Sequence, residues 1–428
     1  MQVREALAGS ELKGDFNMFF VFAFLISVAP SAWASQVHIS VVSGGNETAF
    51  YGRYNSGDGV VVVTPGRPEG AKASMSFSFD SNLDLYVMEP YGDMPERVRG
   101  ELYRYGRLVF FQAEPGHHEH GIDYHEKVDL VLKQPGARRV ENSNFDFNLD
   151  SIPLVQHDPD QLKDWLMKLS GEDEVLVKGK LERIAERGSS SGRRLAREFL
   201  RKEYERLGYN VRFEGYRAGW NRGTNFIAEK IGADSSRVIV VGAHFDSVNN
   251  AGADDDGAGV IASLAIARDL AELKLPVTVR FLGFDQEEKG LVGSKAYVAQ
   301  LAAAGEDQKV VGSFFMEMVG YDSDDDGAFH IVTCPDTPSL ELANLIDASI
   351  LQQKLPLKSI RYCTNRSDHR PFWNRGIPAI LISQNFFSGD PNPCYHKSCD
   401  RVDILNFQYM ARLSSGMSGA IQAFLKSL

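Results

Sequence analysis

The pattern of apolar and polar positions is clearest between residues 237 and 294. Two short runs, residues 238–241 and 277–282, are rich in β-branched side chains and nearly uncharged, as expected for strands covered on both faces. Between them, residues 258–273 carry apolar side chains at helical spacing. The stretch therefore predicts a βαβ unit whose two strands are parallel.

Strand and helix patterns continue to alternate on both sides of this unit, which predicts an α/β domain over residues 151–428. Further strands are expected at residues 211–216, 225–231, 310–316, 329–333 and 377–383. Helices are expected at residues 161–169, 177–186, 191–207, 339–353 and 407–425.

Residues 35–150 have a different pattern of apolar and polar residues. Short alternating runs are separated by turns rich in Gly, Pro and Asn, a pattern that predicts a small all-β domain, either a pro-domain or an accessory module. Four histidines gather near its end, at positions 117, 118, 120 and 125. We interpret them as part of a polar loop rather than a metal site.

The first 34 residues are interpreted as a signal peptide. Residues 19–28 form an apolar run too short to span a bilayer, and Ala32, Trp33 and Ala34 form a small-x-small cleavage pattern. A membrane anchor or a buried core segment is the alternative. Cleavage after Ala34 predicts a secreted or periplasmic protein without a membrane attachment.

Composition narrows the possible partners. The chain has 428 residues, 43% of them hydrophobic, enough for two or three domains, and its net charge of −11 argues against a nucleic-acid-binding surface. Two of its four cysteines, Cys394 and Cys399, are close in sequence, so a disulfide is expected between them in an oxidising compartment.

Polar side chains follow both strands of the βαβ unit. His244 and Asp246 come after the first strand, and Glu287 and Glu288 after the second. Because sites in open α/β sheets form outside the carboxyl ends of the strands, these residues are expected to lie together. Residues 254–256, three adjacent aspartates in a glycine-flanked turn, would repel one another unless a cation compensates their charge.

Imidazole and carboxylate groups without thiolates suit zinc or a similar divalent ion at a catalytic site. The excess of carboxylates suggests two ions with one aspartate between them. Taken singly, the aspartates fit a solvated turn or helix cap, the glutamates an exposed helix start and His244 a core histidine. Their joint placement at successive strand ends favours one shared site.

An ordered set of motifs resembles the co-catalytic zinc aminopeptidases, family twenty-eight of the metallopeptidases. The motifs are GAHFDS, GADDDGAG, FDQEEKGLVGS, FMEMVGY, SDHRPFW and YHKSCD, and the resemblance covers roughly residues 162–428. It implies a mixed, mostly parallel eight-stranded sheet sandwiched by helices, and two zinc ions. His244 and Glu317 would hold one ion, Glu288 and His396 the other, and Asp255 would bridge them.

The resemblance also implies a mechanism. Glu287 would be the general base for a metal-bridging water that attacks the first peptide bond of a substrate with a free N-terminus. Asp246 would orient His244, and the peptide bond between Asp255 and Asp256 is expected to be cis. Position 317 carries glutamate where several relatives have aspartate. Asp368, His369 and Tyr362 are expected at the substrate wall or behind the ligands, and the protein is expected to act as a monomer.

Three other functions share part of this pattern. A glutaminyl cyclase, an acyltransferase on the same scaffold, uses one zinc ion, whereas the GADDDGAG turn favours two. Metallopeptidase family twenty has similar ligands but inserts a lid domain, for which the segment between Glu317 and His396 is too short. A binding protein on a decayed scaffold should have lost ligands or the base, and this chain retains all of them.

Overall fold

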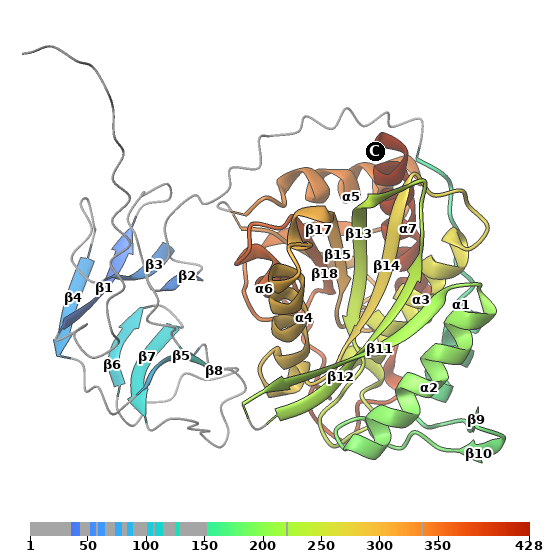
Figure 1. Ribbon diagram of the computed structural model, residues 1–428, viewed down its shortest axis with the longest axis horizontal. Helices are drawn as coiled ribbons and strands as arrows, with labels where there is room; N and C mark the ends of the chain where they lie inside the picture. The colour runs from blue at the N-terminus through green and yellow to red at the C-terminus, as the bar shows by residue number, and fades with distance from the viewer. Residues whose placement is uncertain are drawn as a thin grey trace, which may run out of the picture.

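The computed structural model describes residues 152–219, 221–334 and 337–428, together with the backbone of eight strands between residues 36 and 127 (Figure 1). The helices are α1 (Pro159–Leu169), α2 (Ser190–Arg206), α3 (Gly259–Leu270), α4 (Val292–Ala303), α5 (Leu340–Gln352), α6 (His369–Trp373) and α7 (Phe407–Ser427). A short hairpin consists of β9 (Val175–Val177) and β10 (Lys180–Glu182).

One eight-stranded sheet organises this domain, in the order β11-β12-β14-β13-β15-β18-β16-β17. Its strands are β11 (Asn210–Ala218), β12 (Asn221–Lys230), β13 (Asp234–His244), β14 (Val277–Phe284), β15 (Val310–Met316), β16 (Ala328–Val332), β17 (Lys358–Tyr362) and β18 (Ala379–Gln384). Strand β13 pairs in parallel with both β14 and β15, and β15 pairs in parallel with β18. Antiparallel pairs lie toward the edges, so the predicted mixed, mostly parallel sheet is confirmed.

Helices cover both faces of the sheet (Figure 1). Helix α3 packs on β13 and on α7, while α4 packs on β11 and β12 and α6 on β18. Along β13 the side chains alternate between two cores: Ile239 belongs to the larger one with α3 and α7, and Val240 to the smaller one with α4 and α6. This alternation explains why β13 is apolar along its centre.

Helix α2 illustrates how local sequence and packing agree. The Ser189 side chain accepts the backbone N–H of Gly192 at 3.1 Å and caps the helix. Further along, Tyr204 is buried with its ring 5.1 Å from that of Phe226 and 5.6 Å from that of Phe281. Burying an aromatic side chain of this kind stabilises a fold by about 2 kcal/mol, so the apolar face fixes α2 on the sheet.

The helix predicted at residues 177–186 is wrong. The chain forms the β9–β10 hairpin there, because Lys178 and Gly179 adopt left-handed φ angles of 49° and 82°. Two successive left-handed residues make the tight turn that reverses a strand, and glycine is the residue that adopts this conformation at least cost. The apolar residues Val175 and Val177 then face the core from one side of a strand.

Residues 36–127 contain the strands β1 (Gln36–Val42), β2 (Gly52–Ser56), β3 (Gly59–Thr64), β4 (Ala73–Ser78), β5 (Asp84–Met88), β6 (Glu101–Tyr105), β7 (Leu108–Ala113) and β8 (His125–Lys127). Their backbones pair as two antiparallel sheets, β2-β3-β1-β4 and β6-β7-β5-β8. The all-β domain at residues 35–150 stays a prediction, because most of its connections lie outside the described residues. The signal peptide at residues 1–34 also lies outside them.

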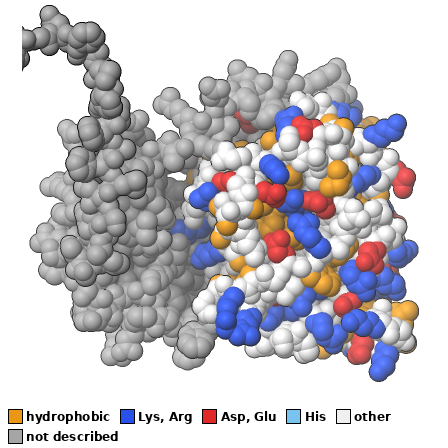
Figure 2. All heavy atoms as spheres, viewed as in Figure 1, with side chains coloured by type: hydrophobic (Ala, Val, Ile, Leu, Met, Phe, Trp, Pro, Cys, Tyr) orange, Lys and Arg blue, Asp and Glu red, His pale blue; other side chains and the backbone are white. Residues whose placement is uncertain are grey.

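Within the described part of the chain, no helix is long and apolar enough to cross a membrane. On the face shown in Figure 2, the Lys and Arg side chains of the described residues are interspersed with Asp and Glu. That face therefore carries no extended basic patch of the kind that binds nucleic acid.

Candidate active site

The first group of site residues stands at the end of β13. The backbone N–H of His244 donates to the carboxylate of Asp256 at 3.2 Å. The Nδ1 atom of the same histidine lies 3.2 Å from the carbonyl oxygen of Asp246 and 3.5 Å from its carboxylate. If the proton is on Nδ1, the lone pair of Nε2 is free to bind a metal, as in most histidine ligands.

Asp255 lies in the turn Ala253–Ala258, which follows β13 and leads into α3. One of its carboxylate oxygens lies 3.2 Å from Nε2 of His244, and the other lies 3.1 Å from Nε2 of His396. The side chain thus faces a different histidine with each oxygen. The peptide bond between Asp255 and Asp256 is cis, as expected from the sequence.

The other carboxylates of this turn are used to hold it. Asp254 accepts the backbone N–H of Gly320 at 3.1 Å and the side-chain amides of Gln384 and Asn392 at 2.7 and 2.6 Å. Asp400 accepts the backbone N–H groups of Asp254 and Asp255 at 2.8 and 3.2 Å. The turn is therefore fixed by hydrogen bonds on several sides, and Asp255 is left to face the cavity.

The three-residue helical turn after β14 carries two adjacent glutamates that differ in their surroundings. The carboxylate of Glu288 lies 3.0 Å from Nε2 of His396. In contrast, no hydrogen bond or ion pair among the described residues involves the carboxylate of Glu287, although that residue lines the cavity. One glutamate therefore contacts His396, and the carboxylate of its neighbour faces the cavity without such a contact among the described residues.

His396 comes from a loop far along the chain. It is bracketed by a disulfide between Cys394 and Cys399, which confirms the pairing expected from the sequence. Its ring stacks on that of Tyr395 at 3.8 Å between centroids. The loop is thus restrained on both sides of the histidine, so the imidazole is held beside Asp255 and Glu288.

Glu317 directly follows β15 and lines the same cavity. Its carboxylate accepts a hydrogen bond from Ser367, and its Oε2 atom is buried without a hydrogen-bond partner. The parallel pairing of β13 with β15 brings this strand end next to His244. All five residues expected as metal ligands, and Glu287, therefore lie at one end of the sheet.

The residues expected at the substrate wall occupy three different places. Asp368 is buried and makes a hydrogen bond with Ser294. His369 is buried as well, and its Nε2 atom lies 2.9 Å from the carbonyl oxygen of Thr364, so it supports a loop instead of facing the cavity. Tyr362 stacks on Phe387 at 4.4 Å, and it is Phe387 that lines the cavity.

Left-handed backbone conformations recur beside the site residues. Gln286, which precedes Glu287, has φ 62°, Met318, which follows Glu317, has φ 50°, and His396 itself has φ 57°. For residues other than glycine this conformation costs about 1 kcal/mol or more. Such outliers collect at functional sites, and here they turn the chain sharply where each strand or loop delivers a side chain.

Burial dominates the electrostatics of the cluster. It raises the pKa of the Glu288 and Glu317 carboxyls to about 7 and that of Glu287 well above its usual value. Burial would also raise the pKa of Asp255, but the two histidines beside it outweigh this effect and hold it below its usual range. A carboxylate cluster of this kind is stable in its charged form when cations compensate it.

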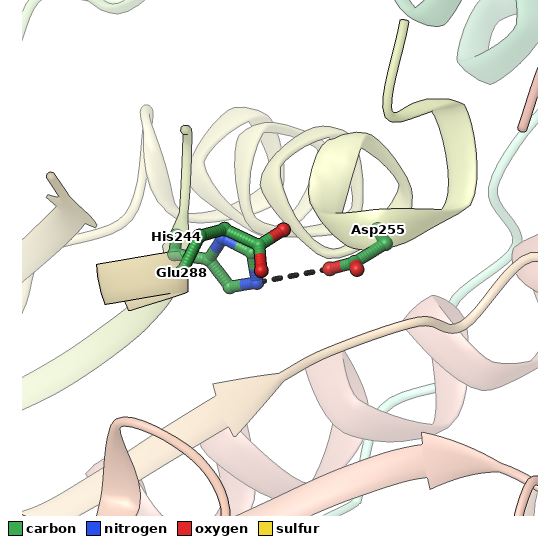
Figure 3. A group of neighbouring side chains, drawn as sticks. All are labelled: His244, Asp255 and Glu288. Atoms are coloured by element: carbon green, nitrogen blue, oxygen red, sulfur yellow. Dashed lines mark ion pairs between the residues drawn. The ribbon is translucent and has the colours of Figure 1, made fainter. Parts of the chain in front are cut away.

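The side chains fit metal ions. His244, Asp255 and Glu288 each offer one ligand atom, and the three atoms lie within 4.8 Å of one another (Figure 3). The Oε1 atom of Glu288 and the Nε2 atom of His244 are buried and make no hydrogen bond of good geometry among the described residues. Imidazole and carboxylate donors are those that zinc prefers at catalytic sites.

The cavity next to this cluster encloses about 730 Å³ of space, including open solvent at its mouth. Its floor contains Asp255, the two glutamates after β14, Glu317 and His396. An apolar part of its wall consists of Leu291, Met318, Leu381, Phe386 and Phe387. Acidic groups therefore adjoin an apolar part of the cavity wall.

Two supporting residues were not anticipated. Arg187 is fully buried, and it donates to the backbone carbonyls of Phe245, Ala251 and Gly252 under the aspartate turn. Asp400, which holds that turn from the other side, belongs to the YHKSCD motif and could have been suspected from it. Arg187 lies just after the helix predicted at residues 177–186, and no motif around it indicates a role.

Comparisons with known proteins agree with this geometry. Residues 225–421 match Peptidase family M28. Leupeptin-inactivating enzyme 1 of Streptomyces exfoliatus is 30% identical over 253 residues, 54% of this chain and 55% of that protein. Leucine aminopeptidase 2 of Trichophyton rubrum is 36% identical over 231 residues, 49% of this chain and 46% of that protein. The chain thus spans about half the length of these two relatives.

Solved structures show the same fold. The LapA aminopeptidase of Legionella pneumophila superposes with a TM-score of 0.57 at 20% identity, covering 79% of this chain and 98% of that one. A glutaminyl cyclase of Fimbriiglobus ruber superposes with a TM-score of 0.51 at 19% identity, covering 63% of this chain and 96% of that one. The segment that matches Peptidase family M28, residues 225–421, contains every strand end that carries a site residue.

Proposed function

We propose that this chain is a zinc-dependent aminopeptidase that removes the N-terminal residue of peptides. The observation that supports it most is the position of Asp255, whose two oxygens lie 3.2 and 3.1 Å from the Nε2 atoms of His244 and His396. A carboxylate placed between two histidines in this way suits a bridge between two metal ions.

Two zinc ions would be held by the residues around this bridge. His244 and Glu317 would hold one ion, and Glu288 and His396 the other, with Asp255 shared. When bound, the ions would polarise the scissile carbonyl and lower the pKa of the attacking water. The buried carboxylates, whose pKa is raised by desolvation, would then be fully ionised.

Glu287 would act as the general base. It lines the cavity next to Glu288, and its carboxylate is not engaged by another described side chain. Burial raises its pKa well above the usual value, and a group with a raised pKa can both accept the proton of the attacking water and return it to the leaving amine. The carboxylate of Asp246 accepts the backbone N–H of Glu287 at 3.0 Å and so holds this glutamate in place.

The substrate would be a peptide with a free N-terminus and an apolar first residue. The acidic floor of the cavity would attract the α-ammonium group, while Leu381, Phe386 and Phe387 would contact the side chain. A leucine-like residue agrees with this wall, and one of the relatives is named leucine aminopeptidase 2. The two disulfides, Cys334–Cys363 and Cys394–Cys399, agree with action in an oxidising compartment outside the cytoplasm.

A glutaminyl cyclase is the second candidate, since solved cyclases share the fold. The experiment that separates them uses the full chain loaded with zinc. We expect release of p-nitroaniline from leucine-p-nitroanilide, no release from its N-acetylated form, and no pyroglutamate from a peptide that begins with glutamine. Zinc measured by atomic absorption should approach two ions per chain. Cyclisation without hydrolysis, with one zinc ion, would replace this proposal by the cyclase.

A further inference from the structure

A second acidic cluster lies away from the residues discussed so far. Asp322 and Asp324 belong to the segment between β15 and β16, and Asp390 belongs to the loop after β18. Each offers one carboxylate oxygen, and the three oxygens lie within 4.8 Å of one another. No ion pair among the described residues involves any of the three. Their mutual repulsion would favour separation unless a cation lies between them.

Asp322 gives an independent reason to expect a ligand. Its side chain is buried, with 8% of the residue exposed, and its Oδ2 atom has no hydrogen-bond partner. Among the described residues, the carboxylate of Asp322 accepts a hydrogen bond from the backbone N–H of Gly327. A buried carboxylate oxygen without a partner is unfavourable, and a bound cation would relieve this.

The sequence around Asp322 has the spacing of a calcium loop. Asp322, Asp324 and Asp326 alternate and are followed by Gly327, which matches the first six positions of the D-x-D-x-D-G pattern. Gly327 has a left-handed φ of 69°, and an added Cβ would lie 2.5 Å from the carbonyl oxygen of Pro356, so the turn requires glycine.

The site departs from that pattern in two ways. Asp326 forms an ion pair with Lys358 at 3.2 Å and is therefore engaged elsewhere. The twelfth position of the pattern falls on Thr333, not on glutamate. Asp390 supplies a third carboxylate from a different loop, and it is held there by the backbone N–H and the hydroxyl of Ser323, both at 2.6 Å.

We propose that Asp322, Asp324 and Asp390 bind a calcium ion. The donors are all carboxylate oxygens, with no imidazole or thiolate, which favours a hard cation over zinc. Carboxylate oxygens that lie within 4.8 Å of one another are close enough to share one ion, given Ca–O distances of about 2.3–2.6 Å. Water and backbone carbonyls would complete the coordination.

The ion would join two segments that border the cavity. The segment with Asp322 continues from Glu317 and Met318, and the loop with Asp390 continues from Phe386 and Phe387. Calcium would therefore fix the aromatic wall of the cavity relative to the loop after β15. This role does not depend on the reaction that the cavity performs, because it concerns only the stability of the wall.

The test uses the full chain. Calcium is first removed on a chelating resin, and zinc is then added back. Isothermal titration with CaCl2, up to about 5 mM to include the weak range of extracellular calcium modules, should show one ion per chain. Excess calcium should raise the Tm of the wild-type protein. Asp324→Asn and Asp390→Asn should weaken calcium binding at least tenfold and abolish the rise in Tm.

The matched control is Asp325→Asn, in the same loop. Asp325 lies 3.4 Å from the side-chain amide of Asn406 and 3.9 Å from Arg412, and it is not part of the cluster. Its variant should bind calcium like the wild-type protein. Because Asp324 is exposed, its replacement leaves the fold intact and the test interpretable. Absence of calcium binding to the wild-type chain, or wild-type affinity for calcium in both cluster variants, would overturn the proposal.

Discussion

The carboxylate of Asp246 accepts the backbone N–H of Glu287 at 3.0 Å, while the same side chain lies 3.5 Å from Nδ1 of His244. A second backbone N–H, that of Glu288, lies 3.4 Å from its other oxygen. One side chain thus joins the ends of β13 and β14. It sets the orientation of a proposed ligand and the position of the proposed base at the same time.

Replacing Asp246 should therefore disturb both functions. In Asp246→Asn, the amide NH2 cannot accept a backbone N–H. One orientation of the amide therefore removes the acceptor of Glu287 and faces His244 with a second donor, and the other removes the acceptor of Glu288. We expect kcat to fall by about 10–100-fold, the range for groups that orient metal ligands, together with weaker zinc retention during dialysis. Asp164→Asn, whose side chain is 48% exposed on α1, serves as the control and should keep both properties.

Glu287→Gln separates catalysis from metal binding. Glutamine keeps the size of the side chain but cannot take a proton, so kcat should fall by about 10²–10⁴-fold while zinc content stays at the wild-type level. The neighbouring variant, Glu288→Gln, should instead lower zinc content, since that carboxylate lies 3.0 Å from His396. Full turnover by the Glu287 variant would assign the proton transfer to another group.

Much of the fold followed from the sequence because the central strands are buried on both faces. Strand β15 begins and ends at the predicted residues, 310 and 316, and β13 and β14 are parallel neighbours as expected. The strand-end rule then brought His244 and the two glutamates together before any relative was considered. His396 was a candidate because its loop follows the last predicted strand, but its role as a ligand came only from the resemblance.

Other features depend on contacts that no local pattern encodes. The disulfide between Cys334 and Cys363 forms because β16 and β17 are parallel neighbours, with Val332 opposite Tyr362, and the spacing of 29 residues gives no hint of it. The β9–β10 hairpin was mistaken for a helix because its apolar residues also fit a helical spacing over so short a segment.

Arg187 is expected to be essential for stability. It is completely buried and donates to the carbonyl oxygens of Phe245 at 2.8 Å and Gly252 at 2.6 Å. Arg187→Met would leave these buried acceptors without donors, which should lower the free energy of unfolding in urea by about 3–5 kcal/mol. Arg183→Met, an exposed arginine in the preceding segment, should change it by about 0.5 kcal/mol or less.

The pH dependence of stability should contain a contribution from His330. This ring is fully buried, and its Nε2 atom accepts the backbone N–H of Phe387 at 3.2 Å, which requires the neutral imidazole. Burial lowers its pKa from 6.5 to about 4. Between these two pH values the unfolded chain binds a proton that the folded chain does not, so stability is complete above about pH 6.5 and is lost as the pH falls toward 4.

A shift of this size corresponds to about 3 kcal/mol for the single group. The measurement is the free energy of unfolding between pH 7 and pH 4.5 for the wild-type chain and His330→Gln, which keeps an acceptor but does not titrate. The variant should lose less stability over this range. His369, whose pKa burial also lowers to about 4, titrates in both proteins and cancels in the comparison, so parallel curves would show that His330 does not carry this effect.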